Sequence, residues 1–127
     1  MKYLCLVYGE ERALGAMASA ELDALIDESL SYDDVLRKSG HYIVSQALRS
    51  VADAATLRAR KDKLTVTDGP FAETKEQLLG FILIDARDKD DALQVAAKMP
   101  MARVGTIEVR PVREPCGGSG QTRNLST

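Results

Sequence analysis

The chain has few of the residues that staple small domains or bind metals. Among its 127 residues it has two cysteines, one histidine and no tryptophan. Cys5 lies in an apolar run and Cys116 in a Gly/Ser-rich stretch far away, so the pair makes no disulfide framework. A single histidine without any Cys-x-x-Cys spacing offers no metal-ligand pattern, and phosphate-binding and dinucleotide motifs are missing too. We therefore expect neither a metal nor another cofactor.

The sequence also lacks a long apolar run and an excess of charge. Its longest apolar stretches, residues 4–8 and 81–84, fall well short of the roughly 18 residues that a membrane span needs. The first is also too short for a secretory signal and is followed by Glu10, Glu11 and Arg12. A net charge of −2 gives no overall attraction to nucleic acid or anionic lipid. We expect a cytoplasmic protein that binds neither.

What is present has the composition of one globular domain. Hydrophobic residues make up 45% and charged residues 28% of the chain, as in ordinary soluble domains. The predicted helices and strands all fall within residues 1–113. Residues 114–127 contain a Gly-Gly-Ser-Gly segment, which is typical of a flexible linker. We expect one domain over 1–113 and a flexible C-terminal tail over 114–127.

The predicted elements alternate in a recognisable order. Apolar β-formers predict strands over residues 2–8, 41–46, 79–86 and 104–112. Helices are predicted over 19–39 and 88–99, with Ser19 and Asp88 as N-caps and Gly40 as the C-terminal stop. A hairpin over 56–67 is inserted between the second and third strands. This order predicts an α+β, ferredoxin-like split βαβ fold with an inserted hairpin, both helices packing on one face of an antiparallel sheet.

The first strand is apolar on both sides. Tyr3, Cys5 and Val7 point to one face and Leu4 and Leu6 to the other. Because two helices cover only one face, the other face needs a different cover. We expect the face that carries Tyr3, Cys5 and Val7 to be closed by a second copy, sheet on sheet. The alternative is that the inserted segments of the same chain cover it.

One loop resembles a family signature. Residues 68–76, Asp-Gly-Pro-Phe-Ala-Glu-Thr-Lys-Glu, followed by Gln-Leu-Leu-Gly-Phe, closely resemble the signature of the DGPF branch of the YCII-related proteins. The resemblance extends to residues 1–4, 39–41, 86–88 and 105–112. It implies the dimeric α+β barrel that two ferredoxin-like subunits form, and hence a homodimer. Relatives in this branch are often encoded beside extracytoplasmic-function sigma factors, and the resemblance implies no settled activity.

The first helix predicts a pocket. At 100° per residue, Ser29 and Asp33 fall in the middle of the apolar stripe, where a carboxylate needs a partner or a wet cavity. This indicates a small-molecule site with Asp33 as a catalytic carboxylate and Ser29 in the wall. In the alternative the helix is rotated and Leu30 takes the core-facing place of Ser29. The broader YCII-like pattern carries a histidine on this helix; here Ser29 stands at about that position, so a His/Asp dyad does not carry over.

The signature loop supplies further candidates. Asp68 is placed as a general base, Phe71 as a pocket wall, Glu73 as a ligand-orienting carboxylate and Lys75 as an anion partner. The alternative for Asp68 is an Asx-turn, in which the carboxylate accepts a hydrogen bond from its own backbone.

Two residues outside the helix and the loop complete the set. His41 is a candidate acid/base, because imidazole is the side chain suited to proton transfer at physiological pH, and Tyr8 is a candidate for presenting its hydroxyl to a ligand. The alternatives are a structural hydrogen bond for His41 and core packing for Tyr8.

Two functions fit these residues. The first is a homodimer with a small-molecule pocket between the first helix, the sheet and the loop over residues 68–75, acting as an acid/base enzyme without a cofactor. The second is a non-catalytic ligand-sensing or protein-interaction module that is functionally linked to a sigma factor.

Overall fold

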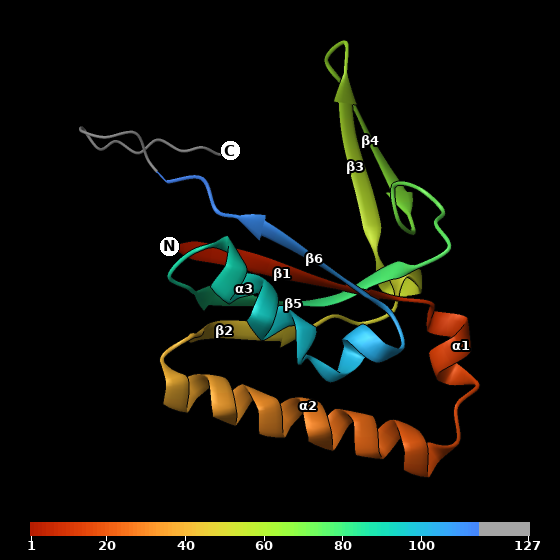
Figure 1. Cartoon of the computed structure of the whole chain (residues 1–127). Helices are drawn as coiled ribbons and strands as arrows, with labels where there is room; N and C mark the ends of the chain where they lie inside the picture. Colours follow the sequence, from red (N-terminus) through yellow and green to blue (C-terminus); the bar gives the residue numbers. More distant parts are fainter. Residues whose placement is uncertain (115–127) are drawn as a thin grey trace.

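A computed structural model describes residues 1–114, so the predicted tail, except for Glu114, lies outside them. A four-stranded sheet of β1 (Lys2–Gly9), β2 (Tyr42–Ala47), β5 (Gln77–Asp85) and β6 (Thr106–Pro111) has the order β2-β5-β1-β6, and all its pairs are antiparallel. The helices are α1 (Glu11–Gly15), α2 (Ser19–Ser39) and α3 (Lys89–Ala97), with short 3-10 turns at Val51–Asp53 and Pro100–Arg103. β3 (Ala55–Arg60) and β4 (Lys63–Asp68) form a separate hairpin (Figure 1). The ferredoxin-like α+β fold with an inserted hairpin is confirmed.

The helix boundaries follow from local chemistry. Gly40 ends α2 with φ of 83°, a left-handed conformation that glycine adopts without strain. The Asp88 side chain accepts a 2.8 Å hydrogen bond from the backbone N–H of Asp91 and so caps α3, as predicted. The prediction that Ser19 caps α2 is wrong: Ala18 is the N-cap residue, and no side chain bonds to the free N–H groups there.

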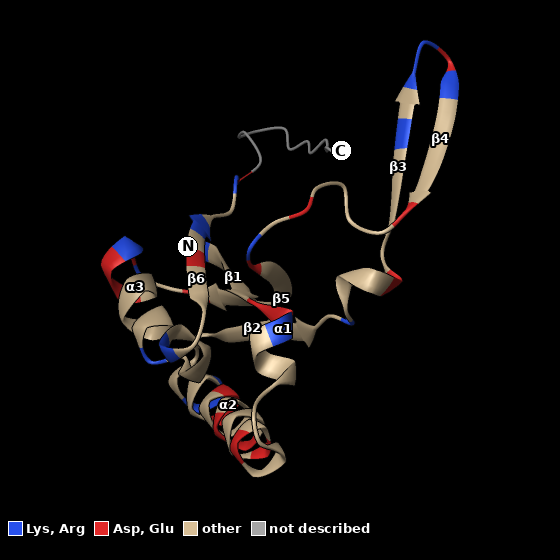
Figure 2. Cartoon of the chain, turned by 90° about the vertical axis from the view of Figure 1, so that its right-hand side faces the viewer, with Lys and Arg blue, Asp and Glu red and all other residues tan. Residues whose placement is uncertain are grey.

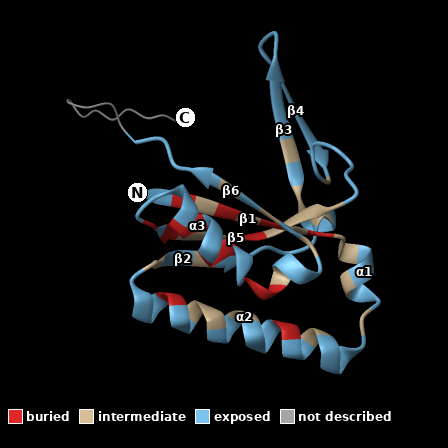
Figure 3. Ribbon diagram, viewed as in Figure 1, coloured by how far each residue is buried: buried red, intermediate tan, exposed pale blue. Residues whose placement is uncertain are grey.

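The covered face of the sheet is the one with Tyr3, Cys5 and Val7. These side chains are buried, and Tyr3 and Cys5 belong to a core cluster with Leu36 of α2 and Val95 of α3. Figure 3 shows the buried residues gathered on β1, β5 and the adjoining helices. The expectation that this face lacks helices is therefore wrong, because alternation fixes which residues share a face but not which face the helices cover.

The opposite face of the sheet has no helix of residues 1–114 over it (Figure 1). In the register of β1 and β5, Leu4 lies opposite Leu83 and Leu6 opposite Phe81, and all four side chains are only half-buried. We call this surface, defined by these four residues, the open face. The hairpin does not cover it: β3 and β4 pair only with each other and stand away from the sheet (Figure 1). Large apolar surfaces of this kind are normally covered by a partner.

Within residues 1–114, no helix is both long enough and apolar enough to cross a membrane.

We expect Gly80→Ala to destabilise the fold. Gly80 lies in β5 between β1 and β2, and a Cβ there would lie 2.6 Å from the carbonyl oxygen of Gln46 and 3.2 Å from Cα of Ala47. Because both atoms belong to the backbone, the strands must separate, so the free energy of unfolding should fall by about 1–3 kcal/mol in urea denaturation. Gly15→Ala, where nothing lies within 4 Å of the added Cβ, is the control. Equal stability of the two variants would contradict the close strand packing.

Candidate functional site

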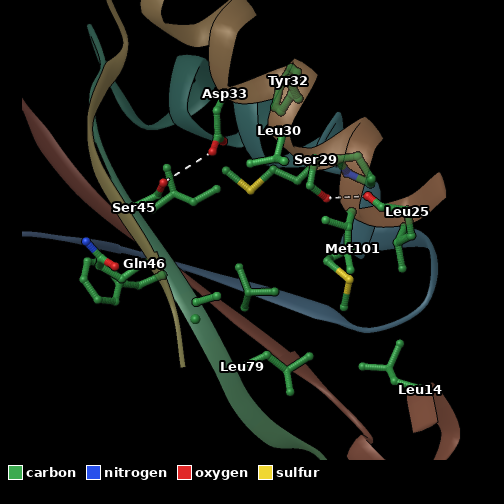
Figure 4. A pocket seen from close by; sticks show the side chains of 18 of the residues that line it. Leu14, Leu25, Ser29, Leu30, Tyr32, Asp33, Ser45, Gln46, Leu79 and Met101 are labelled. Carbon is green, nitrogen blue, oxygen red and sulfur yellow. Dashed lines mark hydrogen bonds between the residues drawn. The ribbon is translucent and has the colours of Figure 1, made fainter. Parts of the chain in front are cut away.

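A cavity of about 470 Å³ lies between α2 and the sheet (Figure 4). Most of its wall is apolar and includes Leu14, Leu25, Ile26, Leu79, Ile82 and Met101. The cavity results from the side chains that α2 directs toward the sheet. Leu25 and Leu36 are buried there, but Ser29 and Asp33, which lie between them, are too small or too polar to fill the space. Its size and apolar lining are those of small-molecule sites.

The polar groups of the cavity are nearly all engaged. Ser29 Oγ donates to the carbonyl of Leu25 at 2.9 Å, and the hydroxyl of Tyr32 donates to the carbonyl of Val95 at 2.7 Å. Asp33 Oδ2 accepts a 3.3 Å hydrogen bond from Ser45 Oγ. Among the described lining residues, Asp33 carries the only formal charge, and no lysine, arginine or histidine joins it. The carboxylate therefore keeps free acceptor positions in an apolar surrounding.

Burial raises the pKa of Asp33 above the usual aspartate range. The hydrogen bond from Ser45 and the charge of Arg37 lower it in part, and the neighbouring Asp34 raises it further. The charge of Arg37 contributes little to lowering the pKa of Asp33 because its guanidinium is engaged elsewhere. It pairs with Asp34 at 2.6 Å and stacks over the ring of Tyr42, 4.3 Å from the centroid. Asp33 is thus a more basic carboxylate than an exposed one.

A short chain of hydroxyls leads from Asp33 along the sheet. Ser45 Oγ, which donates to Asp33, lies 2.7 Å from the hydroxyl of Tyr42. Sequence reasoning missed both residues, since strict alternation puts positions 42 and 45 on opposite faces. A bulge between Tyr42 and Val44 shifts the register, so Tyr42 and Ser45 both point toward the helices. Bulges of this kind often re-aim side chains beside functional sites.

The structure places Ser29 and Asp33 together in the cavity wall. Leu30 is 60% exposed, so the alternative in which it replaces Ser29 is not the one observed. The other predicted residues do not line the cavity.

The signature loop lies outside the cavity, beside the base of the hairpin. Asp68, Phe71, Glu73 and Lys75 are all exposed, Phe71 by 75%. Gly69 takes a φ of 96°; its N–H donates to Ala54 at 2.7 Å and its carbonyl accepts from Thr56 Oγ1 at 2.8 Å. These bonds tie the loop to the start of β3. The site roles of the four loop residues stay predictions.

Tyr8 also points elsewhere. It is half-buried, and its hydroxyl donates to Glu108 Oε1 of β6 at 3.5 Å. Glu108 lies opposite Leu6 in the sheet, so the pair sits on the side of the open face and not of the cavity.

His41 belongs to a second polar cluster, where α2 ends and α3 begins. Its Nε2 lies 3.1 Å from Asp91 Oδ2 and its Nδ1 2.7 Å from Ser39 Oγ. The backbone N–H of Arg87 donates to the same Asp91 oxygen at 3.0 Å. The hydrogen bond from the Arg87 N–H, followed in size by the one with His41, lowers the pKa of Asp91 to about 2. The cluster joins the two helices and lies apart from Asp33. Among residues 1–114, no three His, Cys, Asp or Glu side chains are grouped to hold a metal ion.

Comparison with known proteins identifies relatives of this chain. The family model of the YCII-related domain matches residues 1–115. An uncharacterized protein of Rhizobium meliloti (strain 1021) is 37% identical over 114 residues, 88% of this chain and 92% of that relative. The solved structure of 5-chloro-2-hydroxyhydroquinone dehydrochlorinase from Burkholderia phenoliruptrix AC1100, in complex with 2,5-dihydroxybenzoquinone, has a TM-score of 0.51 at 16% identity and covers 89% of this chain and 94% of that one. At this identity the likeness concerns the fold alone.

We expect Asp91→Asn to reduce the loss of stability in acid. The folded-state pKa of Asp91, about 2, is below the value of about 3.9 in an unfolded chain. The ionised carboxylate therefore stabilises the fold above about pH 4, and this contribution is lost as the pH falls toward about 2. In urea denaturation across this range, the free energy of unfolding should fall more steeply for the wild type than for Asp91→Asn. Asp90→Asn, at an exposed neighbour, should keep the wild-type slope; a wild-type slope in Asp91→Asn would contradict the assignment.

Proposed function

We propose, since the chain belongs to the family of YCII-related domain proteins, that it binds a small, uncharged, apolar molecule in the cavity under α2 and takes a proton from it with Asp33. The observation that supports this is a half-buried carboxylate of raised pKa, facing an apolar cavity of about 470 Å³ in which no described lining residue is a cation. Perturbed titratable groups in clefts are typical of functional sites. No cofactor is needed for this chemistry.

The lining defines the class of ligand. An anion is disfavoured because it would face Asp33 with no cation to offset the repulsion. A ring or short aliphatic body fits the apolar wall, and one O–H group fits the free acceptor positions of the carboxylate. Phenols and enols combine these features. The dehydrochlorinase of similar fold was solved with 2,5-dihydroxybenzoquinone, which is also a small ring that carries O–H groups.

The reaction step that this geometry supports is proton abstraction. The O–H bond of the ligand breaks, its proton goes to Asp33 Oδ, and the electron pair stays on the ligand as an enolate or phenolate. Ser45 holds the carboxylate in place, and Tyr42, bonded to Ser45, extends the hydroxyl chain along the sheet. A base of raised pKa is better matched to this step near neutral pH than an exposed aspartate.

We also propose that the protein is a homodimer. Leu4, Leu6, Phe81 and Leu83 form the open face, which no helix of residues 1–114 covers (Figure 1). Two copies placed sheet on sheet bury this open face against itself, which is the isologous arrangement of a two-fold dimer.

A second candidate is a ligand-sensing or protein-interaction module without catalysis. The observation that favours it is that Asp33 stands without a histidine or lysine in the described lining, so a complete acid/base pair is missing there. Binding with no proton exchange at the ligand would favour this candidate. A link to a sigma factor belongs to this second proposal.

We expect Asp33→Asn to weaken the binding of 2-naphthol, the probe for the cavity. Asparagine keeps the size of the side chain but removes the charge-assisted hydrogen bond, so the dissociation constant in calorimetry should rise about tenfold or more. Acidification through the raised pKa of Asp33 should weaken wild-type binding in the same direction, because the protonated carboxyl is a poorer acceptor.

Two controls make this prediction specific. Asp27→Asn, at an exposed position of α2, should bind like the wild type, and 2-methoxynaphthalene, which has no O–H, should not distinguish Asp33→Asn from the wild type. Asp33→Leu should abolish binding and raise the free energy of unfolding by about 1 kcal/mol, since it removes a desolvated carboxylate. Equal 2-naphthol affinity in all these variants would contradict the proposed site.

A further inference from the structure

The hairpin of β3 and β4 is amphipathic and exposed on both sides. Its register pairs Leu57 with Val66 and Ala59 with Leu64 on one side, and Arg58 with Thr65 on the other. Leu57, Leu64 and Val66 are 62%, 63% and 62% exposed. Apart from Thr56, every residue of both strands is exposed. The hairpin therefore presents an apolar side that nothing within residues 1–114 covers.

A hairpin of this kind is poorly stable on its own. An isolated two-stranded ribbon is marginal in water because it has no third strand or helix to pack against. In the described residues, β3 and β4 pair with no other strand, and the hydrogen bonds of Gly69 hold only the base. The apolar side of the hairpin thus requires a cover from outside residues 1–114.

The direction of the hairpin indicates which molecule supplies that surface. In Figures 1 and 2 the hairpin rises from the sheet on the side away from α2, which is the side of the open face. Its strands of six residues span about 20 Å at about 3.3 Å per residue. Two sheets packed face to face lie about 10 Å apart. The sheet of a copy seated on the open face therefore lies within reach of the hairpin.

The charge of the hairpin is opposite in sign to the net charge of the chain. The tip and polar side of the hairpin carry Arg58, Arg60, Lys61 and Lys63 beside one acidic residue, Asp62, whereas the whole chain has a net charge of −2. A basic arm on an otherwise acidic molecule is attracted to a second copy of that molecule.

We propose that the hairpin is an arm that clasps a second copy of this chain and buries Leu57, Leu64 and Val66 against it. This inference rests on the homodimer proposed above. Under two-fold symmetry each copy gives one arm and receives one. The signature loop then has a structural role, because Gly69 and its bonds to Ala54 and Thr56 set the base of the arm.

The double variant Leu57→Thr/Val66→Thr tests the arm. Threonine is β-branched and favours strands, so the hairpin ladder should persist, while its hydroxyl disfavours burial without a partner. Each dimer loses four buried apolar side chains, and the dimer dissociation constant from sedimentation velocity should rise about 100-fold or more. Circular dichroism of the variant should match that of the wild type.

Matched variants separate the arm from the dimer itself. Thr65→Ser, on the polar side of the hairpin, should leave the dissociation constant within about threefold of the wild type. Leu83→Arg, on the open face, should make the protein monomeric. A dimeric wild type with unchanged affinity in Leu57→Thr/Val66→Thr would overturn the arm and leave the dimer standing. A monomeric wild type at micromolar concentration would overturn both. If Leu57→Thr/Val66→Thr keeps the dimer affinity but, unlike the wild type, fails to bind phosphatidylserine vesicles, the apolar side of the hairpin faces a lipid surface instead.

Discussion

The candidate site depends on one unfavourable placement. The Asp33 carboxylate lies on the side of α2 that faces the sheet, in an apolar surrounding. Leu25 and Leu36, before and after it, hold the helix in this orientation, so Asp33 stays on the side that faces the sheet. The helix cannot pack closely over Ser29 and Asp33, and the gap is the cavity. Burial in this gap makes the carboxylate more basic. Polar residues on the sheet-facing side of α2, Ser29 and Asp33, thus create the space for a ligand, and Asp33 is also the group that acts on it.

The sheet imposes the second constraint. It is apolar on both faces, and its helices lie on one. The helix-free face of the sheet and the hairpin lie on the same side of the molecule (Figures 1 and 2). One partner therefore satisfies both surfaces, and a second copy of the chain is the simplest such partner. On this view the signature loop serves assembly, since it anchors the hairpin rather than lining the cavity.

Most of the fold followed from the sequence, and part of the site did. Alternating strands, the Asp88 cap and the Gly40 stop predicted the elements because these signals are local. The covered face was assigned to the wrong side, because a strand pattern with two apolar faces does not say where the helices lie. Helical periodicity put Asp33 on the sheet-facing side of α2, where it lines a cavity, and its site role stays a prediction. Ser45 and Tyr42 were missed because their side chains point to the same face only through a β-bulge. No residue type in the strand indicates that bulge.

The titration of the Asp33 carboxyl carbon, followed by carbon-13 NMR on selectively labelled protein, tests the central claim most directly. We expect this carbon to titrate at a higher pH than the ordinary range of an aspartate carboxyl, because burial penalises its charged form. Filling the cavity with 2-naphthol should shift its chemical shift, and leave that of Asp27 unchanged. A titration of Asp33 within the ordinary range of an aspartate carboxyl, unchanged by the probe, would contradict a desolvated base in a ligand cavity.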